Sequence, residues 1–181
     1  KAASEETCAE MFSVTREVNE SANYEAYEVS AFAKPGEASL HNLSYWRSLD
    51  YVGIGAGAAG WRDGVRRRNI EKPNEYEDAI ARGEDPVAES ERLPKHIALF
   101  DHLMMGLRLP YEGILLERVQ LATGLNPLVE YKPQLENLFE QNLLELISTE
   151  EGRRLRTTPQ GLLLLDDILT RFLPDEPNLS V

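Results

Sequence analysis

The sequence is poor in features that would assign it to a definite class. It has one cysteine, Cys8, so no disulfide can form within the chain, which suits a reducing compartment. A [4Fe–4S] cluster needs several thiolates, so these residues cannot hold one alone. No run of about 18 apolar residues occurs, and we expect no membrane span. The start, Lys1 to Glu6, has no Met and no apolar signal-peptide core, which suits a fragment or processed chain.

Positive charge is also scarce. The net charge is −12 over 181 residues, and residues 75–181 alone carry 20 acidic and 10 basic side chains. This balance argues against binding to nucleic acid or to an anionic membrane in that half. The remaining composition, 42% hydrophobic and 28% charged, is typical of a globular protein. The length allows one domain or two small ones with a real core.

Apolar residues at helical spacing predict a largely helical chain. The expected helices are 5–23, 74–82, 94–107, 113–123, 132–146 and 159–172. Gly124 should end the fourth of these. Thr158 and Pro159 supply an N-cap and a first helical residue for the last one. We expect this last helix to bury Leu162, Leu165, Leu169 and Phe172.

Strand signals are fewer and shorter. We expect strands at 24–32 and 51–54, and a hairpin at 147–157 that turns at Glu150 to Gly152. The segment around His41 and the acidic stretch 83–92 are interpreted as loops. Together the patterns predict an α+β fold whose second part, three helices, a hairpin and a further helix, is winged-helix-like. A domain boundary is placed in the polar stretch 62–74.

The segment HNLSYW, residues 41–46, joins a potential metal-ligating imidazole to two aromatic side chains. Neutral imidazole is a common metal ligand, also for heme iron. A porphyrin face can stack on Tyr45 and Trp46. The alternative is that His41 and Asn42 fix a loop by hydrogen bonds while the two aromatics fill the core.

The other histidines and the basic arm of the hairpin have simpler explanations. His96 and His102 are six residues apart on one helix and do not share a face, so they are predicted to be structural. No zinc-binding spacing occurs. Arg153, Arg154 and Arg156 form a small basic patch, which we interpret as an ion-paired, solvated strand.

Residues 55–60, GAGAAG, satisfy the GxGxxG pattern after a short predicted strand. A dinucleotide site also needs a helix that starts at the third glycine, within a βαβ unit of about 30 residues. The following residues, WRDGVRRR at 61–68, have no apolar helical face. We therefore favour close approach of the backbone to a ligand or a neighbouring strand, for which glycine has room.

Several segments, taken in order, resemble one family, the heme-chaperone branch of the oxygen-independent coproporphyrinogen III oxidase-like radical SAM proteins. Residues 27–33 are similar to its YEISNFA strand, residues 41–46 match HNxxYW, and residues 50–58 are similar to DYLGIGPGA. LMMGLRL at 103–109 with Glu112-Gly113 resembles its LMMGLRL…EG segment, and the tail around 157–161 resembles its closing LTxxG. The resemblance covers roughly residues 8–173.

The resemblance implies an architecture. Residues 1–68 would be the C-terminal remnant of a radical SAM (β/α) partial barrel, and residues 69–181 a helical winged-helix-like domain. S-adenosylmethionine (SAM) and the [4Fe–4S] cluster would belong to the full-length parent, with the cluster in a missing N-terminal half. An open half-barrel would expose strand edges and apolar surface, which favours self-association.

The resemblance also implies a role in porphyrin biosynthesis and heme supply in the cytoplasm. His41 is its candidate heme ligand, beside Tyr45 and Trp46, and the parent would pass heme to heme-accepting proteins. No catalytic residue is assigned to this chain. The glycines that would line the SAM side of the barrel mouth are Gly53, Gly55 and Gly57.

The sequence departs from the family pattern at Ala31, Leu40, Ala56 and Ala59, where the family has Asn, a polar or basic residue, Pro and His. Lost polar groups beside the glycines put SAM contacts in question more than the fold. Three functions stay open: a heme-binding and transfer module, part of a true coproporphyrinogen III oxidase, and a winged-helix nucleic-acid binder. HNxxYW favours the first, and whether this chain takes part in enzyme chemistry stays open.

Overall fold

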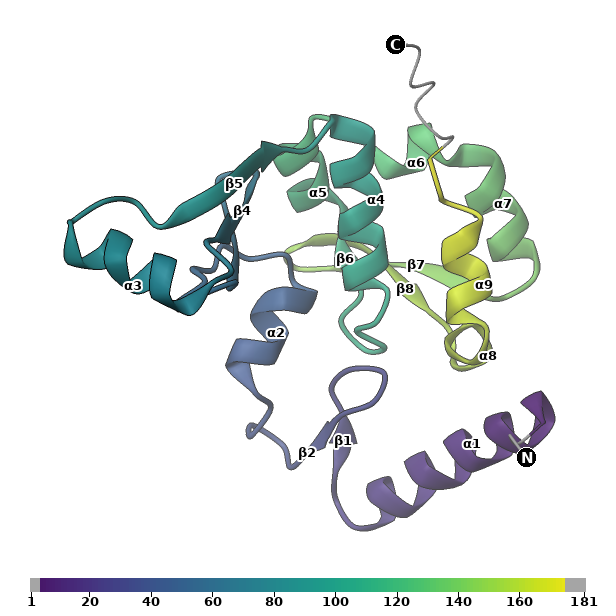
Figure 1. Ribbon diagram of the computed structural model, residues 1–181. Coiled ribbons are helices and arrows are strands. Elements are labelled where there is room, and N and C mark those ends of the chain that lie inside the picture. The colour runs from purple at the N-terminus through teal and green to yellow at the C-terminus, as the bar shows by residue number, and fades with distance from the viewer. Residues whose placement is uncertain (1–3, 175–181) are drawn as a thin grey trace.

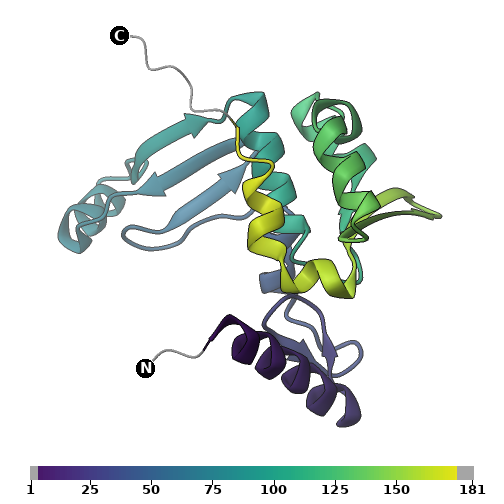
Figure 2. The same ribbon diagram turned by 90° about the vertical axis from the view of Figure 1, so that its right-hand side faces the viewer.

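The structure, a computed structural model, describes residues 4–174. These residues form an α+β fold in which helices surround three small antiparallel sheets (Figure 1). Figure 2 shows the sheet β3–β5 extending on one side of α4, with α7 and the β7–β8 hairpin on the other. No helix in this part of the chain is long and apolar enough to cross a bilayer. The predicted α+β class is confirmed.

The N-terminal helix α1 spans Glu5–Ser21, close to the prediction, and Ser4 caps it by accepting the Thr7 N–H. The predicted strand at 24–32 is wrong. This segment instead forms a small hairpin of two short strands, β1 (Glu25–Ala26) and β2 (Phe32–Ala33). The buried carboxylate of Glu28 accepts the backbone N–H and the hydroxyl of Ser30, both at 3.0 Å, which folds the chain back between the two strands.

The predicted loop around His41 is also wrong, because residues Leu40–Trp46 form helix α2. Ser39 caps this helix, since its Oγ accepts the Asn42 N–H at 3.3 Å. Leu43 is its buried anchor. The motif HNLSYW therefore sits on a regular helical surface.

A three-stranded sheet follows, made of β3 (Ala59–Arg62), β4 (Val65–Asn69) and β5 (Val87–Arg92), with α3 (Pro73–Ala81) between β4 and β5. The predicted strand 51–54 is only an isolated bridge between Tyr51 and Trp61. Much of the predicted acidic loop is strand β5. Its Glu89 and Glu91 stand opposite Arg68 and Arg66 of β4, so opposite charges face each other across the sheet.

The C-terminal part begins with α4 (Lys95–Gly106), β6 (Ile114–Leu115) and α5 (Leu116–Thr123), the last ended by left-handed Gly124 as predicted. Helices α6 (Pro127–Glu130) and α7 (Lys132–Glu140) follow. The predicted hairpin is confirmed as β7 (Leu144–Thr149) and β8 (Gly152–Thr157), and the strand order is β6–β8–β7.

The two ends of this part correct the predicted helix lengths. Helix α7 stops before residue 146, because Asn142 turns the chain at φ 55° and Leu143 and Leu144 are buried at the sheet. The last helix is capped by Thr158 as predicted but divides at Leu164 into α8 (Pro159–Leu163) and α9 (Leu165–Thr170).

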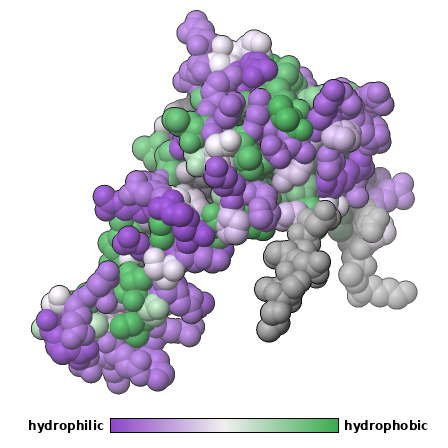
Figure 3. Space-filling view, turned by 90° about the horizontal axis from the view of Figure 1, so that it is seen from above, coloured by the Kyte–Doolittle hydropathy of each residue, from purple (hydrophilic) through white to green (hydrophobic). Residues whose placement is uncertain are grey.

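The core lies in this C-terminal part, in one cluster that runs from Leu99 of α4 to Phe172. The four residues predicted to be its last-helix members are all buried: Leu162, Leu165, Leu169 and Phe172. On α4, Leu99 and Leu103 are buried in this cluster, whereas Met104 is partly exposed. The surface seen from above is mostly hydrophilic with scattered apolar patches (Figure 3).

Candidate functional site

Helix α2 is where several segments of the resemblance meet. The Asn42 side-chain amide donates to the Tyr27 hydroxyl at 3.3 Å, which ties the first segment to the second. The Arg108 guanidinium lies 5.9 Å from the centre of the Trp46 ring, which brings in the LMMGLRL segment. Segments far apart in the sequence therefore surround the helix that carries the HNxxYW motif.

His41 is exposed on α2, and its imidazole belongs to a short row of aromatic rings. Its Nε2 lies 3.1 Å from the Tyr45 hydroxyl one turn later, with ring centres 4.9 Å apart. The Tyr45 ring contacts the Tyr51 ring edge-on at 4.5 Å. Partial burial raises the pKa of Tyr51, with a further contribution from Tyr45, so the phenol stays neutral at pH 7.

The alternative, in which the segment fixes the chain by hydrogen bonds, fits Asn42, which donates to Tyr27, but not His41. His41 contacts a residue of its own helix, so its hydrogen bond fixes a side chain and not a loop. Tyr45 and Trp46 are half-buried, and the buried indole Nε1 of Trp46 meets no acceptor within residues 4–174. If the His41 Nε2–H donates to Tyr45, the lone pair of Nδ1 is left to bind a metal.

The glycine loop is shaped by the protein's own backbone. The close approach to a neighbouring segment that was predicted for residues 55–60 is found at Gly60, where a side chain would lie 3.1 Å from the backbone nitrogen of Gly53. A side chain at Gly53 would clash with the carbonyl oxygen of Ala59. Gly55 and Gly57 adopt left-handed conformations, with φ of 106° and 69°. Strand β3 begins at Ala59 where a dinucleotide site would need a helix, so the GxGxxG match is coincidental.

The residue that holds this loop is Asn69, which sequence reasoning missed. Its buried side-chain amide donates to the carbonyls of Gly53 at 3.1 Å and Gly55 at 2.9 Å. The Gly55 N–H donates to the Tyr76 hydroxyl at 3.2 Å. The only signal was a polar residue at the end of a strand, which does not reveal its partners.

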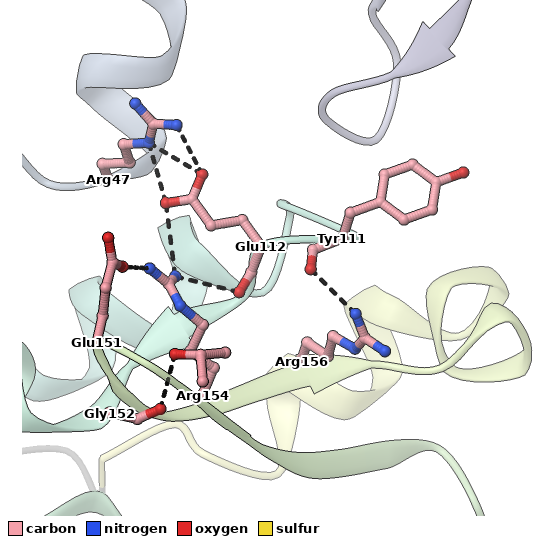
Figure 4. Close-up of polar contacts among 8 residues, drawn as sticks. Arg47, Tyr111, Glu112, Glu151, Gly152, Arg154 and Arg156 are labelled. Atoms are coloured by element: carbon pink, nitrogen blue, oxygen red, sulfur yellow. Dashed lines mark hydrogen bonds and ion pairs between the residues drawn. The ribbon is translucent and has the colours of Figure 1, made fainter.

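A network of ion pairs joins α2 to the C-terminal part (Figure 4). The Arg47 guanidinium donates to both carboxylate oxygens of Glu112, with distances of 2.7 to 3.0 Å. Arg154 of β8 donates to the Glu112 carbonyl at 3.3 Å and pairs with Glu151. Sequence reasoning missed this network, because Arg47 and Glu112 are 65 residues apart.

The hairpin arginines are ion-paired, as the solvated-strand interpretation predicts. Arg153 pairs with Glu117 at 3.3 Å. Arg156 pairs with Glu145 at 2.7 Å. It also donates to the Tyr111 carbonyl at 3.1 Å (Figure 4). Their charges are therefore already matched by carboxylates.

The metal-binding capacity of the described residues is limited. Within residues 4–174, no group of three or more histidine, cysteine or acidic side chains could hold a metal ion, and Cys8 is an exposed free thiol. An iron–sulfur cluster does not fit this set, since it needs several thiolates. Heme places a smaller demand, since one axial imidazole can hold its iron. Exposed His41 meets that demand.

Comparison with known proteins gives two kinds of match. The family model of the HemN C-terminal domain matches residues 93–164. The heme chaperone HemW of Lactococcus lactis is 31% identical over 179 residues, covering 97% of this chain and 44% of that protein. A mouse protein, radical S-adenosyl methionine domain-containing protein 1, mitochondrial, is 32% identical and covers 92% of this chain and 39% of that protein.

The fold matches a solved structure as well. Coproporphyrinogen III oxidase (HemN) from Escherichia coli, a radical SAM enzyme, superposes with a TM-score of 0.60 at 14% identity. The match covers 88% of this chain and 39% of that one. At this identity the likeness concerns the fold alone. The chain thus spans less than half the length of the curated relatives that it matches.

Proposed function

From the premise that this chain is a HemN/HemW-like C-terminal region of the radical SAM group, we propose that it binds heme at helix α2 and takes part in heme transfer. His41 is the iron ligand in this proposal, and Tyr45 and Trp46 shape the surface beside it. The observation that carries the proposal is the exposed imidazole of His41, presented by a capped helix that several family-like segments hold in place.

Heme supplies an iron with open axial positions and a flat apolar ring; this chain's residues bind and orient it. The Tyr45 hydroxyl, 3.1 Å from Nε2, would fix the tautomer and the ring orientation of His41. The edge-on contact of Tyr45 with Tyr51 holds that hydroxyl in turn. Burial raises the pKa of Tyr51, so its phenol adds no negative charge beside the ring, and Arg66 and Asp101 line the same cavity.

The proposal extends to the architecture. Residues 1–68 would be the last part of a radical SAM barrel and residues 69–181 a winged-helix-like domain. Helices α4, α5 and α7 with the β6–β8–β7 sheet support the second assignment. Strand β5 belongs to the same sheet as β3 and β4, so the sheet spans the proposed boundary. In the complete protein, Gly53, Gly55 and Gly57 would face SAM. We place that protein in the cytoplasm.

The enzymatic alternative, coproporphyrinogen III oxidation, has less support. The structural neighbour is that enzyme, but its 14% identity supports the fold only. The relatives at about 30% identity include proteins named heme chaperones. The chain has a single cysteine, so the cluster ligands of such a reaction would have to come from elsewhere.

Hemin titration tests the proposed function. The unsubstituted chain should give a saturable Soret band. His41→Ala should shift or weaken this band because the axial ligand is lost. His96→Ala is the matched control, since His96 is also exposed on a helix surface. Identical titrations for the parent and both variants would contradict His41 ligation and show only hemin adsorption to apolar surface.

A further inference from the structure

Most basic side chains in residues 4–174 are ion-paired, as expected for a chain with a net charge of −12. The exceptions, for which no carboxylate of these residues lies within ion-pair distance, are Lys34, Arg67, Arg92, Lys95 and Arg118. One such cation on a surface is common and indicates nothing by itself. However, Arg92, Lys95 and Arg118 line the same cleft.

This cleft, which we call the basic cleft, has a volume of about 650 Å³, within the range of small-molecule sites. Its three cations come from three elements, since Arg92 ends β5, Lys95 begins α4 and Arg118 lies on α5. Strand β5 leads into α4, and α5 packs beside α4 (Figure 1). Basic side chains from separate elements therefore converge on one concave surface.

The surroundings of the three cations place them at this surface. The Arg92 guanidinium donates to the Asp63 carbonyl at 3.1 Å, at the turn between β3 and β4. The Lys95 ammonium lies at the end of α5, where a side chain on Gly124 would be 3.5 Å from Nζ. Arg118 is half-buried, so its charge is only partly hydrated. A guanidinium in such a position favours an anionic ligand.

The other titratable groups of the basic cleft leave a surplus of positive charge. Asp50 and Asp63 also line it. Asp63 pairs with Arg62 at 3.5 Å, and Asp50 accepts the Asp63 backbone N–H at 3.2 Å. His102 lies in the same wall, and burial lowers its pKa to about 4, so its imidazole is neutral at pH 7. It can still donate or accept a hydrogen bond.

We propose that the basic cleft binds the diphosphate group of a small molecule. A diphosphate carries several negative charges and many acceptor oxygens, so cations from three elements can share it, whereas a single carboxylate occupies one guanidinium fork. Arginine matches phosphate with its planar fork, and lysine binds it as a point charge. Trp61, Leu93 and Leu121 add apolar wall that an organic group can cover. The inference is independent of heme binding at His41.

Calorimetric titration at low salt with inorganic pyrophosphate, ADP and adenosine tests the inference. The unsubstituted chain should bind the first two and not adenosine. Arg118→Met should weaken both about tenfold, the usual size of a charge-assisted hydrogen bond. Arg92→Met and Lys95→Met alter exposed side chains and should each weaken binding about threefold. Arg67→Met is the control, because Arg67 is an exposed arginine outside the basic cleft, and it should bind like the unsubstituted chain.

The two phosphates distinguish the source of the group. Tighter binding of ADP than of pyrophosphate would identify an organic ligand and equal binding an inorganic one, and both support the inference. It is overturned if neither binds, if adenosine binds as tightly as ADP, or if Arg67→Met weakens binding as much as Arg118→Met. A melting curve for each variant identifies misfolding. Should Arg118→Met fail to fold, unchanged binding in both Arg92→Met and Lys95→Met would still contradict the site.

Discussion

The molecule consists of two regions that are stabilised in different ways. Residues 95–174 contain the whole principal core cluster, from Leu99 to Phe172. In residues 4–94 the buried apolar residues are only Ala26, Leu43 and Ala79, while Leu40, Val52 and Ile54 are largely exposed. The candidate heme ligand therefore lies on a region with little core of its own. That region depends on polar and aromatic contacts to the better-packed one.

This difference predicts that stability and ligand binding can be separated. Core substitutions in the second region should unfold the protein. Substitutions on the exposed surface of α2 should change binding with little effect on folding. The ion pair between Arg47 and Glu112 joins the two regions. Its removal should therefore change both stability and ligand binding modestly.

The largest effect is expected in the second region. Leu169→Asp places a carboxylate in the core, where Leu169 is 6% exposed, and it should cost more than about 4 kcal/mol of unfolding free energy. Leu164→Asp is the control in the same segment, at 45% exposure, and should cost little. Urea unfolding followed by circular dichroism gives both values. Equal stability of the two variants would mean that α9 does not pack as described.

A second, smaller effect concerns how stability depends on pH through His102 of α4. The pKa of His102 is lowered from 6.5 to about 4 in the folded protein, so between these values the unfolded state binds a proton that the native state does not. Falling pH therefore costs stability, by roughly 2–3 kcal/mol over this range.

The matching measurement is a series of urea midpoints between pH 7 and pH 4 for the parent and His102→Gln. The variant should lose less stability than the parent across this window, since its side chain does not titrate. His96→Gln, altered at an exposed site of the same helix, serves as the control. Parallel curves for the parent and His102→Gln would argue that His102 is well hydrated.

The smallest stability effect is expected at the link between the regions. The side chains of Arg47 and Glu112 are about one-third exposed, so their coupling free energy should be about 1 kcal/mol despite the bidentate geometry. A double-mutant cycle with Arg47→Met and Glu112→Gln measures it by chemical unfolding. A coupling near zero would separate α2 energetically from the C-terminal part.

The sequence was most informative where signals are local. Thr158 and Pro159 predicted the start of α8, Gly124 the end of α5, and Glu150 to Gly152 the hairpin turn, because caps and turns depend on neighbouring residues. The helix around His41 was missed although Ser39 provides a cap. It is only seven residues long and its polar and aromatic residues show no clear apolar face.

Longer-range features could not be predicted. Strand β5 was taken for a loop because its acidic residues look solvated, and only pairing with the arginines of β4 explains them. The same holds in the candidate site, where the motif pointed to His41. The contacts of Asn69 with the glycine loop and of Glu112 with Arg47 join residues far apart in the chain.

The most direct test of the account is rescue of His41→Ala by free imidazole in a hemin titration. The Soret band of His41→Ala should be weaker than that of the unsubstituted chain because the ligand is lost. Added imidazole should restore the band by occupying the vacant axial position. The same addition should leave the spectrum of His96→Ala like that of the parent with imidazole. Restoration confined to His41→Ala is the result that the account predicts. A His41→Ala spectrum identical to the parent before any imidazole is added would contradict it.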